Sequence, residues 1–245
     1  MSATKPTDAA GNRRPAEWLA KGPGDQPPVA AATVILVRDG PGGIETLMLR
    51  RNSKIAFGGM WVFPGGRIDD ADRAGLDPAD EQAAARRAAV REAGEEAGLA
   101  VVEASLVPFS HWTPPAIAPR RFHTWFFLAP APAGRVSIDD GEIHEHAWLR
   151  PEEALRRRDA QEIELAPPTF VTLFELARMG GVERALAAAR ARTPERYTTR
   201  IAKAQGGVVA LWHGDAGYDA GDAAAPGARH RLWMQDAGWR YERDA

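Results

Sequence analysis

The chain has 245 residues, of which 31 are Lys or Arg and 33 are Asp or Glu, so its formal net charge is −2. Non-specific nucleic-acid binding depends on a basic surface, so we expect no nucleic-acid partner. The absence of cysteine excludes a disulfide framework, a thiolate metal site and a cysteine nucleophile. The length allows one large domain with a substantial core.

Neither a signal peptide nor a membrane helix is expected from the hydropathy. No segment approaches the ~20 apolar residues that a membrane helix needs, and the N-terminal segment lacks the apolar stretch of a signal peptide. We therefore expect a cytoplasmic protein with no membrane partner. Residues 1–29 are rich in Pro, Gly and Ala without periodicity, which is typical of a flexible arm.

The first half of the chain predicts strands around one helix. Residues 31–40 and 44–51 form a predicted hairpin, because a glycine-rich turn separates two apolar runs. An aromatic and glycine-rich loop follows. A helix is then expected from about residue 78 to residue 97, with Asp77 or Asp80 as its N-cap and Gly98 at its C-terminal end.

The second half continues with strands and then helices. Strands are expected over residues 101–112, 121–129 and 141–149, and helices from Pro151 and over 167–179 and 182–192. Short strands and turns should follow, with Trp212, Trp233 and Trp239 packing them down. The order of the elements predicts an α+β or α/β sandwich over residues 30–150 and leaves the sheet topology open. A C-terminal helical extension with an irregular tail is expected over 151–245, packed on the sandwich.

Three carboxylates crowd the segment VREAGEEAGL, residues 90–99. On a helix, Glu92, Glu95 and Glu96 project from one face, where like charges repel. A hard divalent cation, Mg²⁺ or Mn²⁺, would remove the repulsion and could activate water, so these three residues are candidate metal ligands. The alternative is a solvated, charged helix face. Gly65 and Gly66, shortly before the helix, let the loop approach the helix or the metal closely.

PGG followed by REAGEEAGL resembles the Nudix box of Nudix hydrolases, G-x5-E-x7-R-E-U-x-E-E-x-G-U with U aliphatic. The second half of the box matches at Arg91, Glu92, Ala93, Glu95, Glu96, Gly98 and Leu99. The resemblance implies an α+β fold, namely an α/β/α sandwich with a mixed sheet, and metal-dependent cleavage of a nucleoside diphosphate linked to another moiety. It also implies that Glu92, Glu95 and Glu96 bind the metal and that Arg91 holds the loop.

The first half of the box departs from this pattern. Counting back eight positions from Arg91 reaches Ala83 instead of Glu, and 24 residues separate Gly66 from Arg91 where the pattern has 13. About 11 residues are therefore inserted. Several acids near the box could replace the missing one, namely Asp69, Asp70, Asp72, Asp80 and Glu81.

The segment from Gly59 to Gly66 resembles the corresponding segment of the coenzyme A and acyl-CoA diphosphatase branch of the family. A pocket for coenzyme A needs cations for its phosphates. The candidates flanking the site are Arg50, Arg51, Lys54, Arg120 and Arg121. ADP-ribose, NADH or a dinucleoside polyphosphate is the alternative substrate, and a non-catalytic nucleotide-sensing module is the alternative of another class. The resemblance is compatible with a homodimer.

A general base must reach the attacking water, and Glu95, Glu142 and Glu145 are the candidates. Glu142 and Glu145 lie three apart, so on a straight strand only one of them would face the site. His144 and His146 share a strand face and could bind zinc, but no third ligand has matching spacing.

Overall fold

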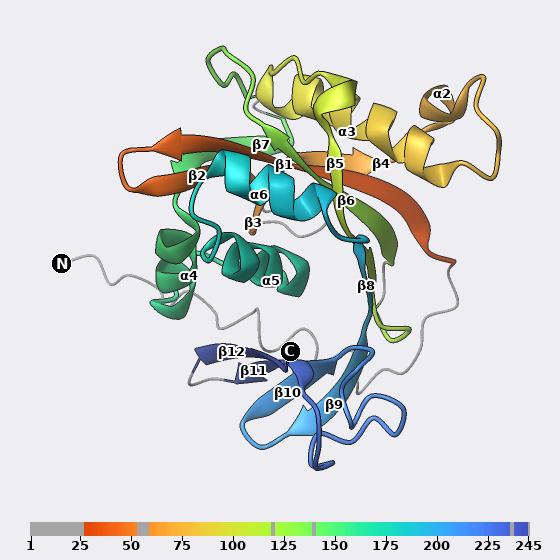
Figure 1. Cartoon of the computed structure of the whole chain (residues 1–245), viewed down its shortest axis with the longest axis vertical. Coiled ribbons are helices and arrows are strands. Elements are labelled where there is room, and N and C mark those ends of the chain that lie inside the picture. The colour runs from red at the N-terminus through yellow and green to blue at the C-terminus, as the bar shows by residue number, and fades with distance from the viewer. Residues whose placement is uncertain (1–26, 53–58, 119–120, 139–140, 236–237, 245) are drawn as a thin grey trace.

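The computed structural model describes residues 27–52, 59–118, 121–138, 141–235 and 238–244. The predicted arm lies almost entirely outside the described residues. Figure 1 shows a large sheet with a long helix on one face, further helices on the other, and a small second sheet beyond them.

The large sheet is mixed, as the resemblance implies. Its strands run in the order β3-β2-β1-β6-β5-β8, with β4 also paired to β1 and β7 to β2. The parallel pairs are β1 with β6 and β5 with β8. The bounds are β1 Val29–Gly40, β2 Gly43–Arg51, β3 Trp61–Val62, β4 Gly65–Arg67, β5 Val107–Thr113, β6 Phe122–Pro130, β7 Ile143–Leu149 and β8 Glu195–Thr198.

The hairpin of β1 and β2 closes through the predicted glycine-rich turn, with Gly40 opposite Gly43. Along β1, alternate side chains enter two different cores: Val34 and Leu36 contact one, and Ile35 and Val37 the other. A strand that is apolar on both faces must be covered on both sides. The helices provide this cover.

Helix α3, Glu81–Ala97, covers one face of the sheet together with the short helix α2, Asp70–Arg73. The Asp80 side chain accepts a hydrogen bond from the Ala83 amide, and Gly98 takes the left-handed conformation at φ 66°. The helix therefore begins three residues later than expected and ends where predicted. Its sheet-facing side consists largely of alanines, which allow close packing: Ala84, Ala85, Ala88, Ala89, Ala93 and Ala97.

Helices α4 (Pro151–Asp159), α5 (Pro167–Leu176) and α6 (Val182–Arg190) cover the opposite face. Prolines occupy the first turns of α4 and α5, where a missing N–H costs no intrahelical hydrogen bond. Residues 101–106, expected as strand, instead include the 3-10 turn η1, Glu103–Ser105, before β5 begins. No helix in the described part of the chain is long and apolar enough to cross a bilayer.

The short strands and turns expected in the C-terminal part are present, and they form a regular sheet. β8 joins the large sheet beside β5, and a four-stranded antiparallel sheet follows, made of β9 Arg200–Ala204, β10 Gly207–Leu211, β11 His230–Gln235 and β12 Gly238–Arg243. Trp212 and Trp239 are buried, as predicted, and Trp233 is partly buried. The Trp239 ring contacts Phe170 of α5, so the second sheet packs on the helical layer.

Candidate active site

The glycine loop reaches the C-terminal half of α3 through β4. Gly65 pairs with Thr33 and Gly66 with Ala32 of β1. The Gly65 amide donates a hydrogen bond of 2.9 Å to Glu96 Oε2. A Cβ on Gly66 would overlap the carboxylate of Glu92. A side chain at this position would therefore require the Glu92 carboxylate to move, because the Gly66 backbone lies against the end of that side chain.

Glu96 is the buried member of the acidic cluster, and Glu92 is partly buried. Glu96 is only 4% exposed. Burial raises its pKa to about 7, and the nearby charges of Glu92 and Glu142 also raise it, whereas the Gly65 amide and Arg51 act in the opposite direction. Burial likewise raises the pKa of Glu92, against the effect of Arg91. Glu95 differs, since its side chain is 59% exposed.

Arg91 links the acidic helix to the loop before it. Its Nη1 donates to Glu92 Oε1 at 2.9 Å and to Glu95 Oε2 at 2.8 Å. Its Nη2 donates to the Arg67 carbonyl at 2.9 Å. The guanidinium thus holds the loop beside the carboxylates, which is the role that the resemblance implies.

Asp72 is the residue that the sequence interpretation did not single out from the other acids. It is 5% exposed and accepts hydrogen bonds from Arg91 Nη2 at 2.9 Å and Arg91 Nε at 3.3 Å. The hydrogen bond to Asp72 is the main cause of the raised pKa of Arg91. Asp72 also accepts a bond from the Asp69 amide, so it fixes the loop itself.

The spacing explains why Asp72 takes this place. Five residues separate it from Gly66, as in the first part of the box, and the insertion lies entirely between Asp72 and Arg91. Among the other candidates, Asp69 lies 3.7 Å from Arg91 Nη2 but its side chain is 55% exposed, and Asp70 is also exposed. Asp80 caps α3, and Glu81 lies 3.9 Å from His111. Counting forward from the glycine, instead of back from Arg91, would have identified Asp72.

Arg51 and Glu142 complete the acidic cluster. Arg51 Nη1 lies 3.4 Å from Glu96 Oε1, and its Nη2 donates to Glu142 Oε2 at 2.8 Å. Arg50 instead pairs with Glu145 at 3.2 Å. Neighbouring strand residues point to opposite faces, so of the two candidate bases beyond the box only Glu142 lies at the site.

Other candidates are not brought to this cluster. Arg121 precedes β6, where its carbonyl accepts a hydrogen bond from the Val29 amide at the start of β1. His144 and His146 are both exposed on β7. Arg120 and Lys54 lie outside the described residues.

The chemistry of the cluster suits a hard divalent cation. Its donors are all carboxylate oxygens, and Glu92 and Glu142 each raise the pKa of Glu96, so the acids repel one another. Within the described residues, however, no three His, Asp or Glu side chains are arranged to hold an ion. Instead, the guanidinium groups of Arg91 and Arg51 lie among the carboxylates. An ion would therefore require these side chains to adjust.

Comparisons with known proteins agree with this geometry. The family model described as the NUDIX domain matches residues 27–169, more than half of the chain. The structure resembles a Nudix hydrolase from Alicyclobacillus acidocaldarius with a TM-score of 0.61 and 23% identity, over 66% of this chain and 97% of that one. A MutT Nudix hydrolase from Burkholderia pseudomallei gives a TM-score of 0.46 and 21% identity, over 61% and 98%. No curated protein matches the sequence. The chain belongs to the Nudix family of pyrophosphohydrolases.

Proposed function

We propose that the protein hydrolyses the pyrophosphate bond of coenzyme A or an acyl-CoA with the help of a divalent metal ion. The supporting observation is the pair of glutamates, partly buried Glu92 and buried Glu96, held against a glycine loop by Arg91 and the Gly65 amide. Nudix hydrolases generally use divalent metals and act on small nucleotide substrates. The coenzyme A assignment rests on the Gly59–Gly66 segment and the nearby arginines.

In the proposed reaction, the oxygen of water bonds to one phosphorus while the bond from that phosphorus to the bridging oxygen breaks. The proton of water passes to a carboxylate, for which Glu95 and Glu142 are the candidates. Arg51 has two terminal nitrogens beside the cluster and would donate to phosphate oxygens. A metal ion held by Glu92, Glu95 and Glu96 would supply Lewis acidity and lower the pKa of a bound water.

A substrate screen tests the proposal. The full chain is incubated with Mg²⁺ or Mn²⁺ and coenzyme A, acetyl-CoA, ADP-ribose, NADH or a dinucleoside polyphosphate, and the products are identified by mass. We expect coenzyme A or acetyl-CoA to give adenosine 3′,5′-bisphosphate and a phosphopantetheine product. Preferential cleavage of another compound would refute the substrate, and metal-dependent binding without any hydrolysis would favour a sensing module.

Glu96→Gln tests the site itself. The amide keeps an acceptor for the Gly65 N–H but loses the charge, so we expect turnover to fall about a thousandfold, because metal-ion catalysis contributes several kcal/mol. The circular dichroism spectrum should not change. Glu103→Gln, an exposed acid on η1, is the matched control. Equal turnover in both variants would exclude the proposed site.

A further inference from the structure

A second concave site lies at an open edge of the large sheet. β8 pairs with β5 only from Ser110 onward, so the first residues of β5 have no neighbouring strand on that side within the described residues. A cavity of about 380 Å³ occupies this place, with Leu106 and Pro108 among its apolar lining residues. A volume of ~300–1,000 Å³ is typical of small-molecule sites.

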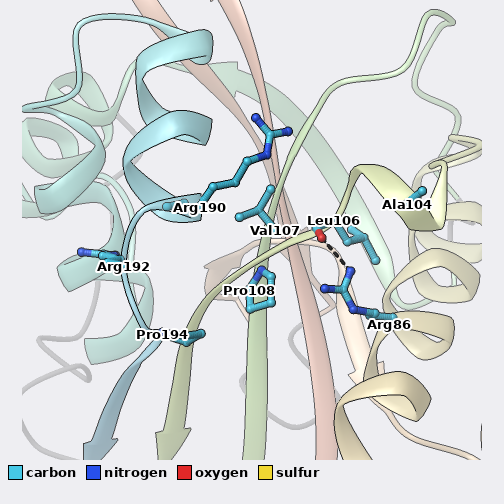
Figure 2. A pocket seen from close by; sticks show the side chains of 9 residues that line it. Arg86, Ala104, Leu106, Val107, Pro108, Arg190, Arg192 and Pro194 are labelled. Carbon is cyan, nitrogen blue, oxygen red and sulfur yellow. Dashed lines mark hydrogen bonds between the residues drawn. The ribbon is translucent and has the colours of Figure 1, made fainter.

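Every charged residue that lines the cavity is an arginine: Arg86, Arg190 and Arg192. Figure 2 shows Arg86 on one side of Val107 and Pro108, with Arg190 and Arg192 on the other. A concave site of one charge sign attracts ligands of the opposite sign. The ligand is therefore expected to be anionic.

The three guanidinium groups keep unused donors. Arg86 Nη1 donates to the Leu106 carbonyl at 2.6 Å, which neutralises no charge. Arg192 Nη2 donates to Glu175 at 2.8 Å, yet its buried Nε has no hydrogen-bond partner. Among the described residues, exposed Arg190 makes no ion pair. Unpaired donors beside a cavity favour a ligand that carries several acceptor oxygens.

The arginines of the cavity come from the inserted stretch of the box or from beyond the family match. Arg86 belongs to the stretch between Asp72 and Arg91 that contains the inserted residues, and Arg190 and Arg192 lie beyond residues 27–169 of the family match. Arg86 also precedes Glu92 by six residues, about 9 Å along α3 and on a different helix face. This site is thus separate from the acidic cluster.

We propose that this arginine-lined cavity binds the phosphate group of a small phosphorylated ligand. Planar guanidinium groups match the oxygens of phosphate, and Leu106, Val107 and Pro108 offer an apolar surface to the remainder of the ligand. Free phosphate and a phosphate monoester share the anchoring group. Only the monoester would also contact the apolar surface.

Isothermal titration calorimetry of the full chain tests the proposal, with inorganic phosphate and adenosine monophosphate as probes. A chelator in the buffer suppresses metal-dependent binding at the acidic cluster. We expect both probes to bind, the monophosphate more tightly. Arg190→Gln should weaken both about tenfold or more, because a hydrogen bond to a charged group is lost. Arg184→Gln, exposed on the same helix, should bind as the unmodified chain does.

Two results would overturn the proposal. One is the absence of phosphate and monophosphate binding by the unmodified chain. The other is equal affinity in the Arg190→Gln and Arg184→Gln variants, above all if Arg51→Gln weakens binding instead, since that would locate the phosphate at the acidic cluster. Unchanged melting temperatures of the α6 variants would show that they are folded.

Discussion

Arg91 is shared among four acidic side chains, and Asp72 holds it most firmly. Asp72 accepts two hydrogen bonds from the guanidinium and is almost fully buried, whereas Glu95 is exposed. Little water competes with a buried acceptor for the guanidinium donors. The hydrogen bonds of Asp72 therefore restrain the position of Arg91 more than those of exposed Glu95 do. The orientation of the acidic cluster therefore depends on a residue that touches neither metal nor substrate in the proposed reaction.

Asp72→Asn should separate this positioning role from catalysis. We expect the free energy of unfolding in urea to fall by about 2 kcal/mol, below the value for fully buried pairs because Arg91 is partly exposed. The kcat should fall as well, since the loop would no longer be fixed. Asp70→Asn, an exposed neighbour, is the control, and similar behaviour of the two variants would contradict the role given to Asp72.

The sequence identified the residues of the second half of the box, but it did not single out the acid of the first half. Glu92, Glu96 and Arg91 follow from a contiguous pattern, whose spacing a helix fixes. The partner of Arg91 was missed by counting back from Arg91, because the inserted residues lie between Asp72 and Arg91 and lengthen that spacing while the two ends stay in contact. The roles of Arg50 and Arg51 were equally hidden, since strand pairing decides which one faces α3.

His111 on β5 gives a pH dependence of stability. Burial, and next the charge of Arg196, lower its pKa to about 4, while Glu81 acts in the opposite direction and His123 adds to the lowering. The unfolded chain takes up this proton near pH 6.5 and the folded chain does not. The stability is therefore complete above pH 6.5 and is lost as the pH falls toward 4.

His111→Gln should flatten this dependence. Between pH 7 and pH 5 we expect the unmodified chain to lose about 1–2 kcal/mol more of its unfolding free energy than the variant does, after allowance for solvent screening. Urea denaturation at both pH values measures the difference. His146→Gln, exposed on β7, should track the unmodified chain. If the unfolding free energy of His111→Gln fell with pH as steeply as that of the unmodified chain, other groups would be the cause of the pH dependence.

At the scale of elements, α3 shows how local signals succeed. Its cap at Asp80 and its end at Gly98 are set by neighbouring residues, so the sequence contains the information. The strand β8 shows the opposite case. Its parallel pairing with β5 joins segments more than 80 residues apart, and no local pattern specifies such a partner. The short strands of the C-terminal part were therefore predicted, but the sheets that they join were not.

Gly94→Ala tests whether α3 is held mainly by packing or also by its own helical propensity. Gly94 is exposed in the helix interior, and an added Cβ would meet nothing within 4 Å. We expect a gain of about 0.5–1 kcal/mol in unfolding free energy, because alanine loses less conformational entropy. Gly66→Ala is the contrasting variant, since its Cβ would displace Glu92. A loss of stability in Gly94→Ala would show that the helix is strained there.

At the scale of the molecule, the second sheet depends on a buried ion pair. Asp215 accepts bonds from Arg231 Nε at 2.7 Å and Nη2 at 2.6 Å, and from the amides of Gly217 and His230. The Arg231 side chain is 1% exposed and the Asp215 side chain is 0% exposed. Each oxygen of the Asp215 carboxylate thus accepts two hydrogen bonds, and together these bonds fix the loop between β10 and β11.

Asp215→Asn should leave Arg231 buried without a counter-charge. We expect a loss of about 3–5 kcal/mol in unfolding free energy, measured by chemical denaturation followed through tryptophan fluorescence. Because Trp239 packs on α5, the large sheet should lose stability in the same transition. Asp219→Asn, exposed in the same loop, should have the same unfolding free energy as the unmodified chain. A separate early transition would mean that the second sheet unfolds independently.

The closure of the α2–α3 segment by Asp72 and Arg91 has a consequence for engineering. Both ends of this segment are fastened at one ion pair, while its tip around Asp77–Asp80 is exposed. Lengthening such a closed loop costs little entropy. The tip is therefore a suitable insertion site for a peptide tag, which would leave the neighbouring carboxylates in place.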